Sequence, residues 1–184
     1  CFGHRLNLVV VEICTTIPVG RNFFGIVERL HSLMEGSAKR HGLFKEVQEE
    51  MASEGESGEG TLRPLSATRW STRVDNCVVL EKTLPAVKTT LERMTEESNF
   101  DRATASDAYA LLKAIDFQFC FYITVFSDIL RLCNVVSKAL QKTSTNISVA
   151  THQVESLIME LQELRSNSHF DEYWMKAEKL ADMI

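Results

Sequence analysis

The sequence predicts an all-α protein, a multi-helix bundle of about eight helices, from two observations. The chain of 184 residues contains only three prolines and eight glycines, which favours long helices over the many turns of a strand-rich fold. Apolar residues make up 45% of the chain, enough for a core, and most recur at the spacing of one helix face. The length suits one domain or a piece of a larger protein.

Apolar periodicity predicts three helices in the first part of the chain, over residues 5–17, 21–35 and 38–51. The run of valines at 9–11 would also suit a buried strand. We expect the first helix to end near Pro18, and Gly36 to end the second. Ser37 can then cap the third helix.

An acidic segment rich in serine and glycine follows these helices. Residues 53–60 read Ser-Glu-Gly-Glu-Ser-Gly-Glu-Gly, which buries no apolar area and carries charges that repel. We therefore predict a flexible acidic loop over residues 53–64. A docking tail is the alternative, and a solvated linker is favoured.

The second half of the chain is predicted to be helical again. Pro85 is expected to divide one helix, near 74–83, from the next, over 84–97. Thr104 with Asp107 resembles a capping box at the start of a helix that runs on into the apolar stretch 117–136. That stretch holds too many polar residues for a membrane span, so we predict a buried central helix.

Two further helices are predicted near the C-terminus. The cap cluster 143–146 precedes a helix over 147–166, and Ser168 with Asp171 is expected to cap the last one. The helix over 147–166 carries a heptad seam, formed by Ile147, Ala150, Val154, Leu157, Leu161 and Leu164. The seam suits a homo-oligomer interface, but packing within one bundle is the favoured interpretation because the seam is short.

Catalytic and metal-binding patterns are sparse. Cys1 and His4 form one pair of potential metal ligands, and no second pair accompanies them, so no metal site is predicted. The other cysteines fall within predicted helices and behave as small hydrophobic residues. No nucleophile elbow or phosphate-binding glycine loop is present, and no small-molecule substrate is indicated. Five scattered cysteines fit a reducing compartment.

Trp70 lies between Arg69 and Arg73 in a chain whose net charge is −5. An indole can stack on a base and guanidinium groups can hold phosphates, which is the chemistry of a nucleic-acid contact. A buried structural corner has the same composition, and the spacing alone favours the corner. The acidic net charge means that any nucleic-acid contact is local.

Several short segments, in this order, resemble those of hAT-superfamily transposases, in the subgroup related to MYM-type zinc-finger proteins. The CxxHxLNL segment begins at Cys1 and includes His4 and Asn7. The segment FFGIVERL at 23–30 and the segment LSATRWSTR at 65–73 follow. Three further matches lie at 128–130, 134–141 and 170–172, so the resemblance covers nearly the whole chain.

The resemblance implies the helical insertion domain of a transposase with an RNase H-like core. It implies that residues 1–20 are a remnant of the edge of that core, 21–52 a helical hairpin and 65–184 the insertion domain. Family members hold two divalent metal ions, Mg²⁺ or Mn²⁺, with three acidic residues. None of those acids is assigned here, so no catalytic residue and no cofactor is expected in this chain.

The resemblance also implies roles for individual residues. Trp70 corresponds to a tryptophan that stacks in the DNA hairpin region, with Arg69 beside it on the backbone. Arg73 completes the predicted DNA-binding set. Cys1, His4 and Asn7 correspond to a structural motif.

The expected function is therefore that of a hAT-type DNA transposase-like protein, located in the nucleus, in which this region assists DNA binding and hairpin handling. DNA is the expected partner, a homo-oligomer is the open alternative, and no membrane association is expected. The alternative function is a domesticated, catalytically inactive protein-interaction or dimerisation module of a nuclear regulator.

Overall fold

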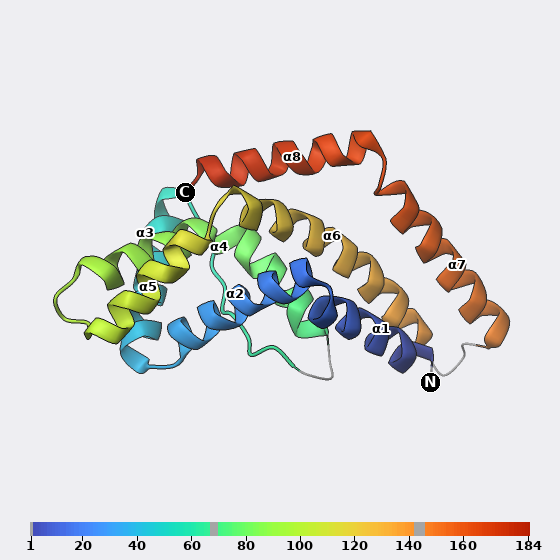
Figure 1. Ribbon diagram of the computed structural model, residues 1–184, viewed down its shortest axis with the longest axis horizontal. Coiled ribbons are helices and arrows are strands. Elements are labelled where there is room, and N and C mark those ends of the chain that lie inside the picture. The colour runs from blue at the N-terminus through green and yellow to red at the C-terminus, as the bar shows by residue number, and fades with distance from the viewer. Residues whose placement is uncertain (1, 67–69, 142–145) are drawn as a thin grey trace.

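The computed structural model describes residues 2–66, 70–141 and 146–184, and these residues form eight helices (Figure 1). The helices are α1 (Phe2–Thr16), α2 (Pro18–Glu35), α3 (Ala38–Glu54), α4 (Ser71–Glu96), α5 (Arg102–Ala114), α6 (Phe117–Leu140), α7 (Ile147–Glu163) and α8 (Asn167–Asp182). No strand occurs within the described ranges. The prediction of an all-α bundle is confirmed.

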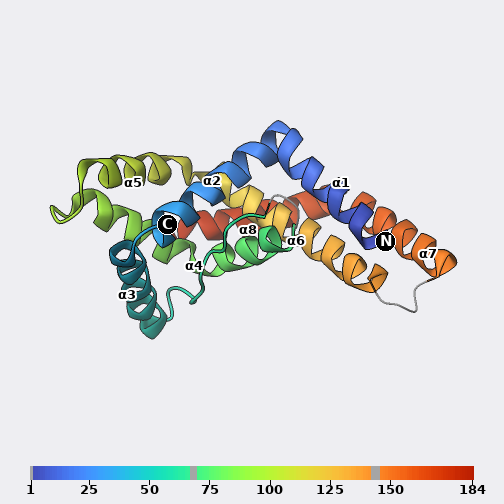
Figure 2. The same ribbon diagram turned by 90° about the horizontal axis from the view of Figure 1, so that it is seen from below.

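Helix α6 is the central element of the bundle. It packs against α1, α4, α7 and α8, and Figures 1 and 2 show these helices gathered around it, with α3 and α5 at the opposite end of the molecule from α7. By length and composition alone α6 is apolar enough to cross a membrane. Contacts with four neighbouring helices account for the same composition, as expected of a central helix.

The start of α2 differs from the prediction. Pro18 does not lie in a connection but occupies the first turn of α2, where its missing N–H costs nothing. The chain turns through 88° between α1 and α2. Gly20 permits this close approach, because a Cβ there would lie 3.2 Å from the Cα of Cys14. Gly36 and Ser37 do end one helix and cap the next, as predicted.

The predicted break at Pro85 is wrong, because α4 continues through it. A proline within a helix removes one backbone hydrogen bond and disturbs its neighbours. Here the N–H of Gly58 donates to the carbonyl of Lys82 at 2.8 Å, and the hydroxyl of Ser57 donates to the same oxygen at 3.2 Å. A segment outside the helix therefore hydrogen bonds to a carbonyl in the helical turn that precedes the proline.

Two predicted helix starts move by a few residues, and one helix start was not predicted. The N-cap of α5 is Asp101, not Thr104, and a separate break at Asp116 starts α6 where a continuous helix was expected. Ser166, not Ser168, caps α8. Each true cap accepts a hydrogen bond from the backbone N–H three residues later, the geometry that a capping oxygen requires. Asn146 caps α7, as the cap cluster predicts, while 142–145 lie outside the described residues.

The cap at Asp101 predicts a dependence of stability on pH. The backbone N–H and the hydroxyl of Thr104 donate to its carboxylate at 2.9 and 3.0 Å, which lowers the pKa of Asp101 below its ordinary 3.8. A lowered pKa contributes stability that is present above pH 3.8 and lost as the pH falls through the folded-state value. Asp101→Asn keeps a capping oxygen that does not titrate. We expect its melting temperature to fall less than that of the native chain between pH 5 and pH 3, and an equal fall would contradict this role.

The segment after α3 includes most of the predicted loop 53–64, whose flexibility stays a prediction. Residues 55–66, here called the linking segment, run along α3 and α4 and hydrogen bond to both. The N–H of Gly60 donates to Oε1 of Gln48 at 2.7 Å, and Leu62 is buried in the core. Asn76 receives the N–H of Arg63 at 2.8 Å and donates to its carbonyl at 2.8 Å. Side-chain amides on two helices thus take the place of regular secondary structure.

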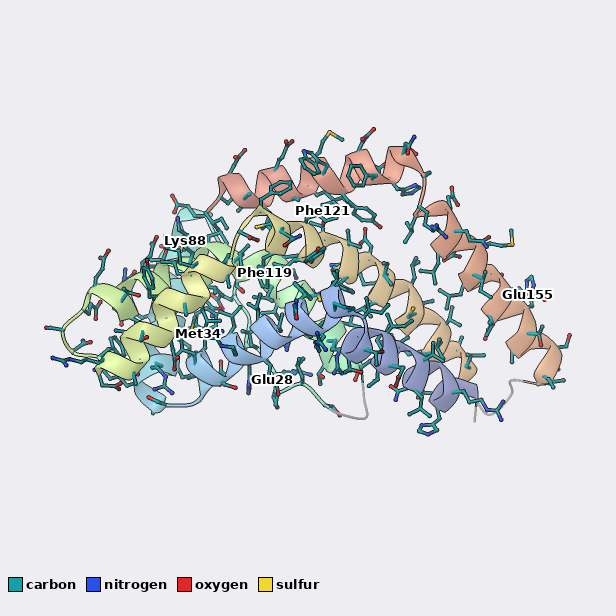
Figure 3. The ribbon with its side chains drawn as sticks, in the orientation of Figure 1. Glu28, Met34, Lys88, Phe119, Phe121 and Glu155 are labelled. Atoms are coloured by element: carbon teal, nitrogen blue, oxygen red, sulfur yellow. The ribbon has the colours of Figure 1, made fainter. Side chains whose placement is uncertain are left out.

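One hydrophobic core joins the four segments that the sequence analysis separates. Val10 of α1, Phe23 of α2, Leu62 of the linking segment and Trp70 before α4 all belong to the same buried cluster. Figure 3 shows Phe119 and Met34 in its interior. The boundaries at 20, 52 and 64 therefore do not divide the core.

Candidate nucleic-acid contact around Trp70

Trp70 lies at the start of α4, between the linking segment and the helix. Its side chain is only 3% exposed, and its carbonyl accepts the N–H of Arg73 at 2.8 Å. The backbone N–H of Trp70 donates to Oδ1 of Asn7 at 3.3 Å. The indole therefore packs in the core in this structure, as the corner interpretation predicts.

Arg73 is buried beside it, with 5% of its surface exposed. One guanidinium N–H donates to the carbonyl of Ser66 at 2.9 Å, and the guanidinium carbon lies 5.6 Å from the centroid of the Phe24 ring. Nε has no hydrogen-bond partner, and no described carboxylate pairs with this charge. Burying a guanidinium group costs free energy, which one carbonyl and one ring face offset in part. We call a buried side chain whose contacts hold this turn in place an anchor, and Arg73 is one.

Three of the segments that carry the family resemblance meet at this point. Asn7 belongs to the first, Phe24 to the second, and Trp70 and Arg73 to the third. Asn7 and Trp70 are separated by 63 positions in the chain, yet direct contacts join the three segments. We call this set of four residues the junction. The sequence analysis did not foresee that these segments touch.

The remaining predicted residues lie around the junction or outside the described ranges. Cys1 and Arg69 are outside the described residues, so their predicted roles stay predictions. His4 is exposed on α1. Arg63, on the linking segment, pairs with Asp75 at 3.2 Å, and both side chains are largely exposed. That ion pair offsets one of the three basic charges that flank Trp70.

The described residues do not fit a metal site. No group of three or more His, Cys, Asp or Glu side chains comes together among them. A divalent metal, which the resemblance implies for the parent enzyme, therefore has no ligand set in this part of the chain. No chemical step is assigned through a metal here.

The four described cysteines are buried and unpaired. Burial raises the pKa of the Cys14, Cys120 and Cys133 thiols to about 11, and burial raises the pKa of Cys77 further. A thiol with a raised pKa is a weak nucleophile at neutral pH. Their description as small hydrophobic residues agrees with the structure.

Asn76 is a structural residue that the sequence analysis missed. Asn76 lies on α4, three residues after Arg73, and is completely buried. Its side chain hydrogen bonds to both the N–H and the carbonyl of Arg63. The available signal was its position, because Arg73, Asn76 and Leu80 fall on one helical stripe that also contains Cys77 and Leu84. Polar residues on such a stripe need partners in the core.

Comparison with known proteins adds no assignment. No family model matches this chain, and comparisons with curated proteins and with solved structures find no significant match.

Proposed function

We propose that this chain is the helical insertion region of a hAT-type transposase-like protein and that it helps to hold DNA at residues 65–73. The observation that carries the proposal is the junction. Three short segments whose order resembles the family make direct contact through Asn7, Phe24, Trp70 and Arg73. Their contact gives the three segments one shared structural role, which supports the resemblance beyond its linear order.

Within the proposed contact, burial separates residues that hold the turn from the residue proposed to bind DNA. Trp70 and Arg73 are buried and serve as anchors, so they hold the turn and do not present their side chains to DNA in this conformation. Arg69 directly precedes Trp70 in sequence and is the residue proposed to bind a phosphate. Stacking of Trp70 on a base would require the indole to leave the core.

The proposed role is positioning and not cleavage. None of the three family acids is assigned to this chain, and the described residues contain no metal-binding group. The net charge of −5 opposes general binding to a polyanion, so the proposed contact is local and the affinity of this region alone is expected to be low. A nuclear location belongs to the same proposal.

A salt titration of DNA binding tests this proposal. We expect the purified chain to bind a fluorescently labelled DNA hairpin, with an affinity that falls as salt rises. Arg69→Ala should weaken binding severalfold and reduce the slope of log K against log salt by about one, the signature of one lost phosphate contact. Fluorescence anisotropy measures both quantities.

The matched control is Arg165→Ala, which removes an exposed arginine between α7 and α8. It should leave both the affinity and the salt slope unchanged. Equal effects of the two variants, or no salt-dependent binding by the native chain, would refute a DNA contact at Arg69.

A further inference from the structure

An apolar groove of about 540 Å³ lies between α1 and α7, over one end of α6. Val9 and Ile13 form the α1 wall, and Val154 and Ile158 form the α7 wall. Leu140 of α6 also lines the groove. In Figures 1 and 2 these two helices lie at the same end of the molecule, on the C-terminal part of α6.

The walls of the groove are exposed although they are apolar. Val9 is 55% exposed, Ile13 45% and Ile158 49%, and Ile147 at the start of α7 is 72% exposed. Of the heptad seam, Ala150 and Leu157 are buried, so α7 uses part of its seam within the bundle. Contiguous apolar surface of this kind marks an interaction site.

Two charged residues at the groove favour a second copy of this chain as its binding partner. Arg5 lines the α1 side and Glu155 the α7 side; both are exposed, and neither forms an ion pair among the described residues. Helix α7 carries three glutamates and no lysine or arginine, so two α7 helices side by side would repel. Packing of α1 against α7 from another copy instead brings Arg5 to Glu155, and Glu12, the one acidic residue of α1, does not line the groove.

We propose that the groove is the interface of a two-fold symmetric dimer, in which α1 of each copy packs against α7 of its partner. In such an interface the contact of Arg5 with Glu155 occurs twice, because each copy supplies both residues. Helices of 15 and 17 residues are about 22 and 25 Å long. Stable dimers bury roughly 800 Å² per subunit, so the interface requires the faces of both helices in each copy.

This inference develops the alternative of a protein-interaction module and does not rest on the DNA proposal. None of the described residues in 65–73 lines the groove. Failure of one proposal therefore leaves the other standing, and the measurements do not overlap.

Sedimentation of the purified 184-residue chain tests the interface. We expect a concentration-dependent dimer, and Ile13→Glu should raise its dissociation constant about tenfold or more because it buries a charge in the apolar contact. Val135→Glu is the matched control, since Val135 is 68% exposed on α6 and does not line the groove. Ile158→Glu repeats the test on the other wall, should Ile13→Glu fail to fold by circular dichroism.

A charge exchange tests the orientation of the helices. Arg5→Glu and Glu155→Arg should each weaken the dimer, and the double variant should restore it. A native chain that remains monomeric overturns the interface. A dimer that survives Ile13→Glu and Ile158→Glu, or a double variant that is no better than the single ones, also overturns it.

Discussion

Replacing Trp70 with alanine is expected to lower the free energy of unfolding by about 3 to 5 kcal/mol. The indole is 3% exposed and belongs to the core cluster that joins α1, α2 and α4, so its removal leaves a cavity. The neighbouring Arg73 would then lie beside empty space with Nε still unpaired. Urea denaturation followed by circular dichroism measures the loss.

The second tryptophan of the chain provides the control. Trp174 on α8 is 43% exposed, donates to Glu178 at 2.8 Å and contacts the rings of Phe117, Phe121 and Phe170. Figure 3 labels Phe121 between α6 and α8. We expect Trp174→Ala to cost about 1 to 2 kcal/mol, since its contacts are partly open to water. If both variants cost the same, Trp70 is not an anchor.

This comparison also bears on the proposed DNA contact. A tryptophan that is free to stack on a base contributes little to folding, whereas an anchor contributes strongly. The expected loss of stability means that an alanine variant at Trp70 confounds folding with binding. Arg69→Ala is therefore the sharper test of DNA binding.

The helical class was predictable because it depends on local pattern. The periodicity of α2 and α7 is strong, and Ser37 and Asn146 carry capping signals that the backbone follows. The errors arose where a local rule competed with a contact distant in sequence. Pro85 predicts a break, but the linking segment supplies a hydrogen bond to Lys82 that no local window contains.

The site was predictable only in part, for the same reason. Composition alone singled out Trp70 and its arginines, and it offered a corner and a nucleic-acid contact as alternatives. Burial of Trp70 and Arg73 depends on Asn7 and Phe24, which lie far away in the chain. The groove between α1 and α7 also needs three helices in place, so no single sequence segment predicts it.

Replacing Asn76 with alanine is expected to cost about 2 to 3 kcal/mol. The side chain is completely buried, and its two hydrogen bonds of 2.8 Å hold the N–H and the carbonyl of Arg63. Alanine leaves both backbone groups of Arg63 without these partners, and Arg63 lies outside any helix that could supply others. Urea denaturation measures the total cost.

Hydrogen exchange locates that cost within the molecule. The amides of Gly58, Gly60 and Arg63 are hydrogen bonded to neighbouring helices, and Asn76→Ala should speed their exchange more than that of amides within α6. Asn99→Ala, an exposed asparagine before α5, should change neither stability nor exchange by a measurable amount. Equal acceleration throughout the chain would mean that Asn76 supports the bundle as a whole. Faster exchange of these three amides alone would mean that Asn76 fixes residues 55–66, which precede Trp70 in the chain, against α4.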